Sequence, residues 1–560
     1  MTFDIKKGCN FKLLASGLLI AISFSFLFLS YFYNQAYFTG RHPFPTGDEP
    51  DYLTSAINLK EYGGNLKFVS FVVSSSYKDT RKHPLFLLFL SPFADKSLDF
   101  FVAGKFVNFA LGCALFFISF FVIKNIFSLV SAFYYLAFLT LNEMVLKHTS
   151  IVVPDILMMI LVLLSSYFYI NAFKKSSLGF VFFGSFFASL AFLSKPNGIL
   201  IPIVFGVYSL TAYKKKIFSQ KLVWVAAITF LFFSSPILIR NLLVFKNPFY
   251  NNNVPLLFVA NRQERRSPDF FKEPPTALEY IQSKGLIREI KDYIENSIKM
   301  MSNFSMLALF QQWQLRYSMA IFLLLFIAFI KDKDRVRGKY LLVTFVIFYL
   351  FFAYTYKISP HYRHELPMMF LIIGYLGLYL DKLIKILFKK KSILVVLALG
   401  LILSVYSFVV VKKEQRVFNN EAFAGQVEPL ESHLFLRDWV VSNIYENDTF
   451  VKGFDDRYSF EWYVNIKGSR LIQPYFESMD LFEEYLKTES VDYLIITGPI
   501  VNSFPEIYEE YFVQAGHGNS TVIDVLGIPE VWEVVASYPD WSFLTSEYKY
   551  LIFKIRGLEN

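Results

Sequence analysis

Residues 46–52 read Thr-Gly-Asp-Glu-Pro-Asp-Tyr, and they place three carboxylates, Asp48, Glu49 and Asp51, within four positions. The stretch follows the first long apolar segment, and the chain around it is overwhelmingly apolar. Carboxylates beside a membrane are costly to desolvate, so such a cluster indicates a functional site. The alternative interpretation is a solvated loop that only links two helices.

The composition is typical of a membrane protein. Of 560 residues, 54% are hydrophobic and only 18% are charged, whereas soluble domains carry about a quarter charged residues. The net charge of +9 comes from short basic clusters between apolar runs, which favours membrane orientation over a nucleic-acid groove. Two cysteines, Cys9 and Cys113, lie beside or within apolar runs, which excludes a disulfide framework and zinc-finger spacing.

The apolar runs predict a polytopic α-helical membrane protein, because a span takes roughly 17–25 mostly apolar residues. The first run is too long for the hydrophobic region of a signal peptide, so we expect a retained span. The run 85–94 is too short to span and is expected at the membrane interface. Eleven runs qualify, at about 13–33, 100–123, 126–146, 152–173, 177–194, 197–213, 222–240, 316–330, 340–356, 365–381 and 392–411.

Basic residues at the span ends predict the orientation through the positive-inside rule. With the N-terminus in the cytoplasm, the inside segments hold 20 basic residues but only Asp4, Asp332 and Asp334 as acids, with Asp381 at a border. The segments 34–99, 241–315 and 412–560 then lie on the outer face. We therefore expect a multi-pass protein of the plasma or inner membrane. The inside cations are Lys6, Lys7, Lys12, Lys124, Lys174, Lys175, Lys214, Lys215, Lys216, Lys221, Lys331, Lys333, Arg335, Arg337, Lys339, Lys382, Lys385, Lys389, Lys390 and Lys391.

The tail has a different pattern. Strand-like runs at 449–452, 492–496 and 549–555 alternate with helical patterns at 432–444 and 479–486. Such alternation predicts a small α/β domain, and the tail is long enough to bury a core. The expected division is therefore a transmembrane domain, 1–411, and an extracytoplasmic α/β domain, 412–560.

Polar residues recur at span ends on the predicted outer face. A base combined with a ring of cations fits a reaction that has a phosphate leaving group. The residues are Lys82 and His83 in Arg-Lys-His-Pro (81–84), Asp155 after Pro154, Lys195 in Ser-Lys-Pro-Asn-Gly (194–198), Arg240 before Asn241, and Arg363 in His-Tyr-Arg-His-Glu (361–365).

In this order the motifs resemble the GT-C-fold glycosyltransferases of the protein mannosyltransferase and aminoarabinose transferase superfamily, similar to glycosyltransferase family 39. The resemblance rests on Gly-Asp-Glu (47–49), basic-Pro-Leu (83–85), Pro-Asp (154–155), Lys-Pro-Asn-Gly (195–198), Arg-Asn-x(5)-Asn-Pro (240–248) and Tyr-Arg-x-x-x-Pro (362–367). Tail residues 457–463 and 491–494 are similar to C-terminal domains of prokaryotic members. The resemblance implies inverting transfer of a sugar from a polyprenyl-phosphate carrier on the outer face.

On this interpretation Asp48 is the general base, with a pKa raised by partial burial and by its neighbour Glu49. Glu49 would bind the acceptor or orient the base. The donor phosphate and sugar would contact Arg363, Lys195, Arg240, Lys82, Asp155 and His83. Each cation has an alternative role as a residue snorkelling at the interface. The alternative role of Asp51 is that of a helix-start residue, and the alternative role of Asp155 is that of a helix cap.

Asp48, Glu49 and Asp155 are also candidate ligands for Mg²⁺ or Mn²⁺, and no other cofactor is predicted. The spacing of His361, His364 and Glu365 does not match the usual zinc-enzyme patterns. Arg262, Arg265 and Arg266 are expected on a solvated loop face. The expected partners are a polyprenyl-phosphate sugar, a lipid, glycan or protein acceptor and membrane lipids, with no nucleic acid.

Three other functions remain open at this point. A lipid-linked sugar flippase or transporter would need charges at mid-bilayer and repeat symmetry, but the charges here lie at span ends. A polymerase or ligase that uses diphosphate-linked donors would share the outer basic cluster. A non-catalytic receptor would be expected to carry its distinctive residues in the tail.

Overall fold

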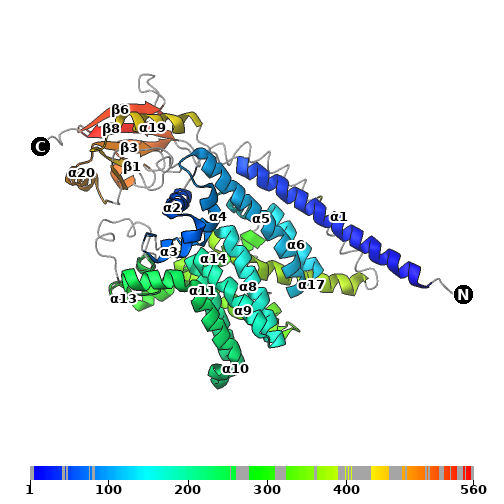
Figure 1. Ribbon diagram of the computed structural model, residues 1–560. Helices are drawn as coiled ribbons and strands as arrows, with labels where there is room; N and C mark the ends of the chain where they lie inside the picture. Colours follow the sequence, from blue (N-terminus) through cyan, green and yellow to red (C-terminus); the bar gives the residue numbers. More distant parts are fainter. Residues whose placement is uncertain are drawn as a thin grey trace.

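The computed structural model describes residues 5–40, 45, 48–74, 76–77, 82–251, 254–259, 276–308, 323, 325–357, 362–388, 398, 402, 405, 430–452, 469–472, 476–497, 501, 505–515, 522–529, 531–538, 547–548 and 550–555. Within these ranges a bundle of apolar helices carries a small sheet near one end (Figure 1). The chain is a multi-pass membrane protein, since several of its helices are long and apolar enough to cross a bilayer.

Six stretches of the described residues are long and apolar enough to span a membrane. Shorter apolar helices are α6 (Leu129–Leu141) and α9 (Leu178–Ser194), and α17 (Met369–Phe388) carries charges in its last turns. The predicted runs 316–330 and 392–411 lie largely outside the described residues. The six are Gly17–Thr39 within α1 (Ile5–Gly40), α5 (Leu98–Ile126), α8 (Asp155–Lys175), Pro196–Ser219 with α10 (Leu200–Tyr213), α11 (Lys221–Phe245) and α16 (Arg335–Thr355).

The prediction of one span over 126–146 is wrong. The helix α6 ends at Leu141, and the side chain of the next residue, Asn142, accepts a hydrogen bond from the Val145 amide at 3.0 Å and so caps the start of α7 (Glu143–His148). Asparagine favours this arrangement because its side chain satisfies an otherwise unpaired amide at a helix start. The break brings His148 and the following loop back toward the start of α8.

Short helices fill the segment between α1 and α5. They are α2 (Glu49–Tyr62), η1 (Asn65–Lys67), α3 (Phe68–Val73), η2 (Pro84–Phe86), α4 (Leu87–Leu90) and η3 (Ser91–Phe93). The predicted short run 85–94 corresponds to the last three, none of which is long enough to span. The segment therefore folds against the end of the bundle instead of crossing it.

The segment 241–315, expected only as a loop, contains helices: η6 (Pro255–Phe258), α13 (Ala277–Lys284) and α14 (Leu286–Ala308). A capping box between Thr276 and Glu279 starts α13. Exposed Ile287, Ile294 and Ile298 mark one apolar side of α14. Its other side packs on α16, where Tyr349 donates a hydrogen bond to the Ser297 carbonyl at 2.6 Å.

The tail forms the mixed sheet β2-β1-β3-β8-β6, in which β2, β1 and β3 are parallel to one another and β8 pairs antiparallel with both β3 and β6. The strands are β1 (Thr449–Lys452), β2 (Ser469–Ile472), β3 (Tyr493–Thr497), β6 (Trp532–Tyr538) and β8 (Tyr550–Ile555). A second sheet pairs β4 (Phe512–Ala515), β5 (Val522–Val525) and β7 (Glu547–Tyr548). The runs predicted for β1, β3 and β8 match these strands, whereas β2, β4, β5 and β7 were not predicted.

Two helices cover opposite faces of the larger sheet, and alternation along the strands sorts the side chains between them. Leu494 and Ile496 of β3 pack with α20 (Met479–Thr488). Ile495, between them, packs with α19 (Leu430–Asn443). Another short helix, α22 (Pro505–Tyr508), joins the α20 side. A layered α/β unit is therefore present, as the strand and helix patterns predicted.

Helix ends position the site. α8 and α9 form an antiparallel hairpin, so the start of α8 and the end of α9 lie at the same end of the bundle. The short helices η8 (Tyr362–His364) and η9 (Leu366–Met368) lead into α17 beside them. At the opposite end Lys174 pairs with Asp334, and Arg337 donates to the Ile126 carbonyl at 2.5 Å. Lys174 and Arg337, two of the predicted inside cations, thus lie at the end opposite to the acidic stretch. The compartment that each end faces remains a prediction.

Candidate active site

Asp48 lies at the centre of the candidate site. It immediately precedes α2, yet its carboxylate makes no capping hydrogen bond and so stays available. Arg363 donates to Asp48 Oδ2 at 3.2 Å, and Lys82 Nζ lies 3.8 Å from Oδ1. Lys82 also pairs with Asp51, one turn into α2. A carboxylate from the segment after α1 and a guanidinium from the segment before α17 therefore meet.

A second ion pair lies next to the first. Lys195 Nζ donates to Asp155 Oδ1 at 2.7 Å, joining the start of α8 to the end of α9. Gly198 makes this turn feasible, because a Cβ there would stand 2.3 Å from the backbone of Ala191. Asp155 is almost fully buried, and within the described residues its Oδ2 has no hydrogen-bond partner. The same holds for Nε of Arg363. Buried atoms left open in this way are typical of sites that take a ligand.

The electrostatics of Asp48 differ from the expectation of a raised pKa. Burial would raise the pKa of Asp48, but the positive charges of Arg363, Lys82 and Lys195 outweigh it, and the pKa lies below its ordinary value. Burial lowers the pKa of Lys82, and nearby Arg363 lowers it further against the opposing effect of Asp48. The site therefore holds an ionised carboxylate among cations over the neutral pH range.

Glu49 points elsewhere. It is 1% exposed, and its Oε1 accepts a hydrogen bond from the Val152 amide at 2.6 Å. It also interacts with the charge of Lys105 on α5. The expected like-charge effect of Glu49 is not among the main influences on the pKa of Asp48. Glu49 thus fixes the start of α2, and with it Asp48, to the segment that precedes Asp155.

His83 and Arg240 are both buried and engaged with backbone carbonyls. His83 Nδ1 contacts the Phe192 carbonyl, and burial lowers the pKa of His83 to about 4. Arg240 donates to the Tyr77 carbonyl at 2.8 Å and stacks on the Tyr77 ring. Their predicted contacts with the donor remain predictions. The observed backbone contacts join the chain on either side of Lys82, at Tyr77 and His83, to α11 and α9.

The predicted metal ligands face different partners. Asp155 pairs with Lys195, Glu49 with the Val152 amide, and Asp48 with Arg363. Among the described residues, no three His, Cys, Asp or Glu side chains group as a metal site. Of the His-x-x-His-Glu motif, His361 is outside the described residues, His364 stacks on Phe352 and Glu365 is buried. Arg262, Arg265 and Arg266 also lie outside them.

Part of the chain matches a known protein family, and its fold matches solved structures. Residues 84–239, which include Asp155 and Lys195, match the profile of the dolichyl-phosphate-mannose-protein mannosyltransferase family. Apo ArnT from Cupriavidus metallidurans is similar in structure, with a TM-score of 0.50 at 10% identity over 98% of each chain. This chain has the GT-C fold of these membrane glycosyltransferases. No curated protein sequence matches the chain significantly.

A second GT-C structure shows the same fold. It is the archaeal oligosaccharyltransferase AglB from Archaeoglobus fulgidus, in complex with an inhibitory peptide and a dolichol-phosphate. Its TM-score is 0.50 at 10% identity, over 88% of this chain and 70% of that chain. At this identity the likeness establishes the GT-C fold, as the ordered motifs predicted.

Sequence reasoning missed one residue of the candidate site. His148 is buried, and its Nδ1 lies 2.7 Å from the Met144 carbonyl. Burial lowers the pKa of His148 to about 4, although the charge of Asp155 opposes the shift. A neutral imidazole thus lies within electrostatic reach of Asp155 and Arg363. The signal in the sequence was a lone histidine between the apolar runs 126–146 and 152–173.

Proposed function

We propose that this GT-C protein moves a sugar from a polyprenyl-phosphate donor to an acceptor at the outer face of the membrane. The matched family is described by a dolichyl-phosphate-linked sugar, and AglB was captured with a dolichol-phosphate. One observation carries the proposal: Arg363, Lys82 and Lys195 surround the carboxylates of Asp48 and Asp155 at one end of the bundle.

The chemistry is a single displacement. The acceptor hydroxyl or amine attacks the anomeric carbon, the bond from this carbon to the phosphate oxygen breaks, and the configuration inverts. Asp48 takes the proton of the acceptor, and polyprenyl phosphate leaves with the bonding electrons. A carboxylate suits the role because proton transfer by a positioned base contributes about 10²–10⁴-fold to rate.

The cations have two functions in this proposal. They stabilise the charge that grows on the leaving phosphate, and Arg363 can grip it with two parallel hydrogen bonds. They also hold Asp48 ionised before the donor arrives. A bound phosphate draws their charge away from Asp48, so its basicity rises once the donor is in place. Asp155 positions Lys195, and Glu49 positions Asp48.

The test uses the full-length protein in lipid vesicles with radiolabelled sugar on polyprenyl phosphate and, separately, on polyprenyl diphosphate. The acceptor fraction is the total membrane extract of the source cells. Transfer from the monophosphate that is lost in Asp48→Asn supports the proposal. Transfer from the diphosphate alone supports a polymerase or ligase. Movement of intact donor across the vesicle without a glycosylated product supports a flippase.

A further inference from the structure

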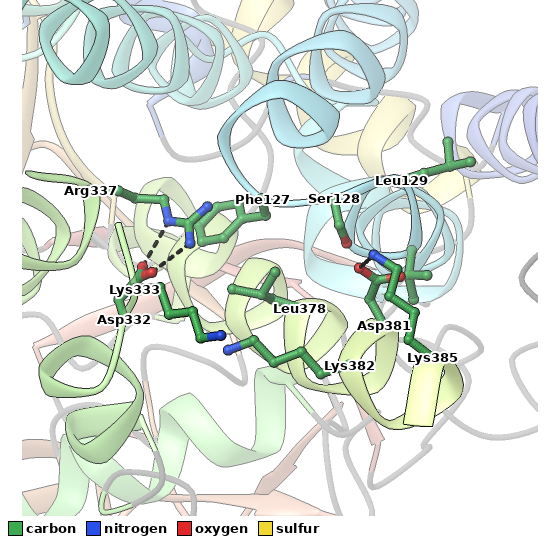
Figure 2. Close-up of a pocket in the computed structure, with 11 residues that line it drawn as sticks. Phe127, Ser128, Leu129, Asp332, Lys333, Arg337, Leu378, Asp381, Lys382 and Lys385 are labelled. Carbon is green, nitrogen blue, oxygen red and sulfur yellow. Dashed lines mark hydrogen bonds and ion pairs between the residues drawn. The ribbon is translucent and has the colours of Figure 1, made fainter. Parts of the chain in front are cut away.

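A cavity of about 570 Å³ opens at the other end of the bundle, between the turn that joins α5 to α6, the start of α16 and the second half of α17. Figure 2 shows its charged residues on the loop before α16, in the first turn of α16 and on α17. Its apolar wall is Phe127, Leu129, Val130 and Leu378. From Met369, beside the candidate site, to Lys385 in this cavity, α17 rises about 24 Å at 1.5 Å per residue.

Both acids in the cavity are already neutralised. Asp332 receives two hydrogen bonds from Arg337, at 2.8 and 2.6 Å, and a third from Tyr375 at 2.7 Å. Asp381 pairs with Lys385 at 2.7 Å. Neither acid is therefore left to balance the other cations that line the cavity.

The remaining cations are Lys333 and Lys382. In Figure 2 their ammonium groups point toward one another across the cavity. Within the described part of the chain, neither has an ion pair, and Lys382 otherwise lies over the ring of Tyr379 at 4.9 Å. Two like charges that face each other repel, and an anion between them would remove the repulsion.

The start of α6 adds to this positive field. The helix is 13 residues long, begins after Ser128 and directs its first turn to the cavity wall through Leu129 and Val130. Helix N-termini carry a partial positive charge and favour anions. The Ser128 hydroxyl accepts from the Ser131 amide at 3.1 Å, so the other amides of the turn supply the field.

We propose that this cavity binds a phosphate-bearing anion between Lys333 and Lys382. The apolar wall beside the two lysines suits the glycerol and first acyl carbons of an anionic phospholipid. Basic pockets between helices on the cytoplasmic side are a known way to hold such headgroups, and this end carries the predicted inside cations. The site is separate from the sugar-transfer site and does not depend on the proposed function.

The experiment measures lipid retention on the purified full-length protein by native mass spectrometry. Phosphatidylglycerol is compared with phosphatidylcholine, and inorganic phosphate serves as the soluble competitor. The pocket variant is Lys333→Gln/Lys382→Gln. Its matched control is Lys215→Gln/Lys216→Gln, which removes the same charge from exposed lysines in η5 (Lys214–Ser219). A charge-preserving variant, Lys333→Arg/Lys382→Arg, separates charge from shape.

We expect phosphatidylglycerol to bind in preference to phosphatidylcholine and to bind about tenfold more weakly to the glutamine pocket variant. The control and the arginine variant should retain it within about twofold on the same reasoning. Displacement by inorganic phosphate would identify the phosphate group alone as the ligand, and resistance to displacement would identify the lipid. Equal weakening in pocket and control variants, or unchanged binding in the pocket variant, would overturn the proposal.

Discussion

The guanidinium of Arg363 lies 3.2 Å from the carboxylate of Asp48, although 315 positions separate the two residues in the chain. The contact joins the short segment after α1 to the segment before α17, and it occupies the atom that would accept a proton. A donor phosphate that takes over Arg363 would release Asp48 at the moment when a base is needed. Substrate binding and activation of the base would then be one event.

The first prediction tests Asp48 as the base. Asp48→Asn keeps the shape of the side chain and removes its basicity, so transfer should fall by about 10²–10⁴-fold. Glu61→Gln is the matched control, because Glu61 is exposed near the end of the same helix α2. Labelled-sugar transfer is measured for both. An Asp48→Asn protein with the rate of the control would remove the assigned role.

The second prediction concerns the leaving group. Arg363→Gln should lower kcat by about 10²–10³-fold, since it removes one contact to the charge that grows in the transition state. Arg363→Lys should recover only part of the loss, because an ammonium cannot bind phosphate through a planar fork. Steady-state kinetics with varied donor concentration give kcat and KM for both variants. A rise in KM with kcat unchanged would mean that Arg363 only binds the donor.

The third prediction follows from the pKa values. The pKa of Asp48 is lowered, so kcat/KM should fall on the acid side only below the ordinary carboxylate range, roughly pH 4. The pKa of Lys82 is lowered too, so as the pH rises Lys82 should lose its charge before an ordinary lysine, whose pKa is roughly 10.4. Arg363→Gln removes a charge that holds the pKa of Asp48 down. Its acid limb should therefore move to higher pH, and an unmoved limb would mean that another group titrates there.

Much of the fold could be predicted from the sequence because hydrophobic length and alternation are local signals. The runs over α5, α8 and α11 match the structure, as do the strands β1, β3 and β8. The prediction failed where a single side chain ended a helix inside an apolar run. Asn142 splits an apolar stretch by capping a new helix, and no hydropathy average detects that.

The sequence predicted which residues form the candidate site but not which of them pair with one another. Ordered motifs indicated Asp48, Lys82, Asp155, Lys195 and Arg363, and the structure brings these five together. Which carboxylate faces which cation depends on packing between helices. Glu49 shows why: it adjoins Asp48 in the chain, yet the helix turns its carboxylate to the Val152 amide. Neighbours in sequence at a helix start do not share a direction.

The fourth prediction separates a positioning role of Glu49 from a catalytic one. Glu49→Ala leaves the Val152 amide without its acceptor, which should cost about 1–3 kcal/mol of stability. Thermal unfolding of the purified protein measures this. Glu49→Gln can still accept the bond, so it should lose less stability and keep at least tenfold more activity than Asp48→Asn, given the contribution of a base. An equal loss of activity in Glu49→Gln and Asp48→Asn would show that Glu49 takes part in catalysis.

The fifth prediction concerns a cluster that ties α14 to the end of α16. Glu289 accepts hydrogen bonds from Lys284 at 2.6 Å, from Lys357 at 2.8 Å and from Tyr280 at 2.8 Å. Lys357 follows α16 and precedes the Arg363 segment, so the cluster fixes α14 and the end of α16 beside the candidate site. A double-mutant cycle with Glu289→Gln and Lys357→Gln should give a coupling of about 0.5–3 kcal/mol.

The exposed pair Glu295 and Lys299 on the same helix is the control, and its coupling should be no more than about 0.5 kcal/mol. Acid provides the second readout. Burial would raise the pKa of Glu289, but its three donors lower it from 4.5 to about 2. A lowered carboxylate pKa stabilises the fold above the unfolded value, and this stability is lost as the pH falls from 4.5 through 2. Glu289→Gln should flatten that loss, and an unchanged acid profile would show that the cluster does not hold α14 in place.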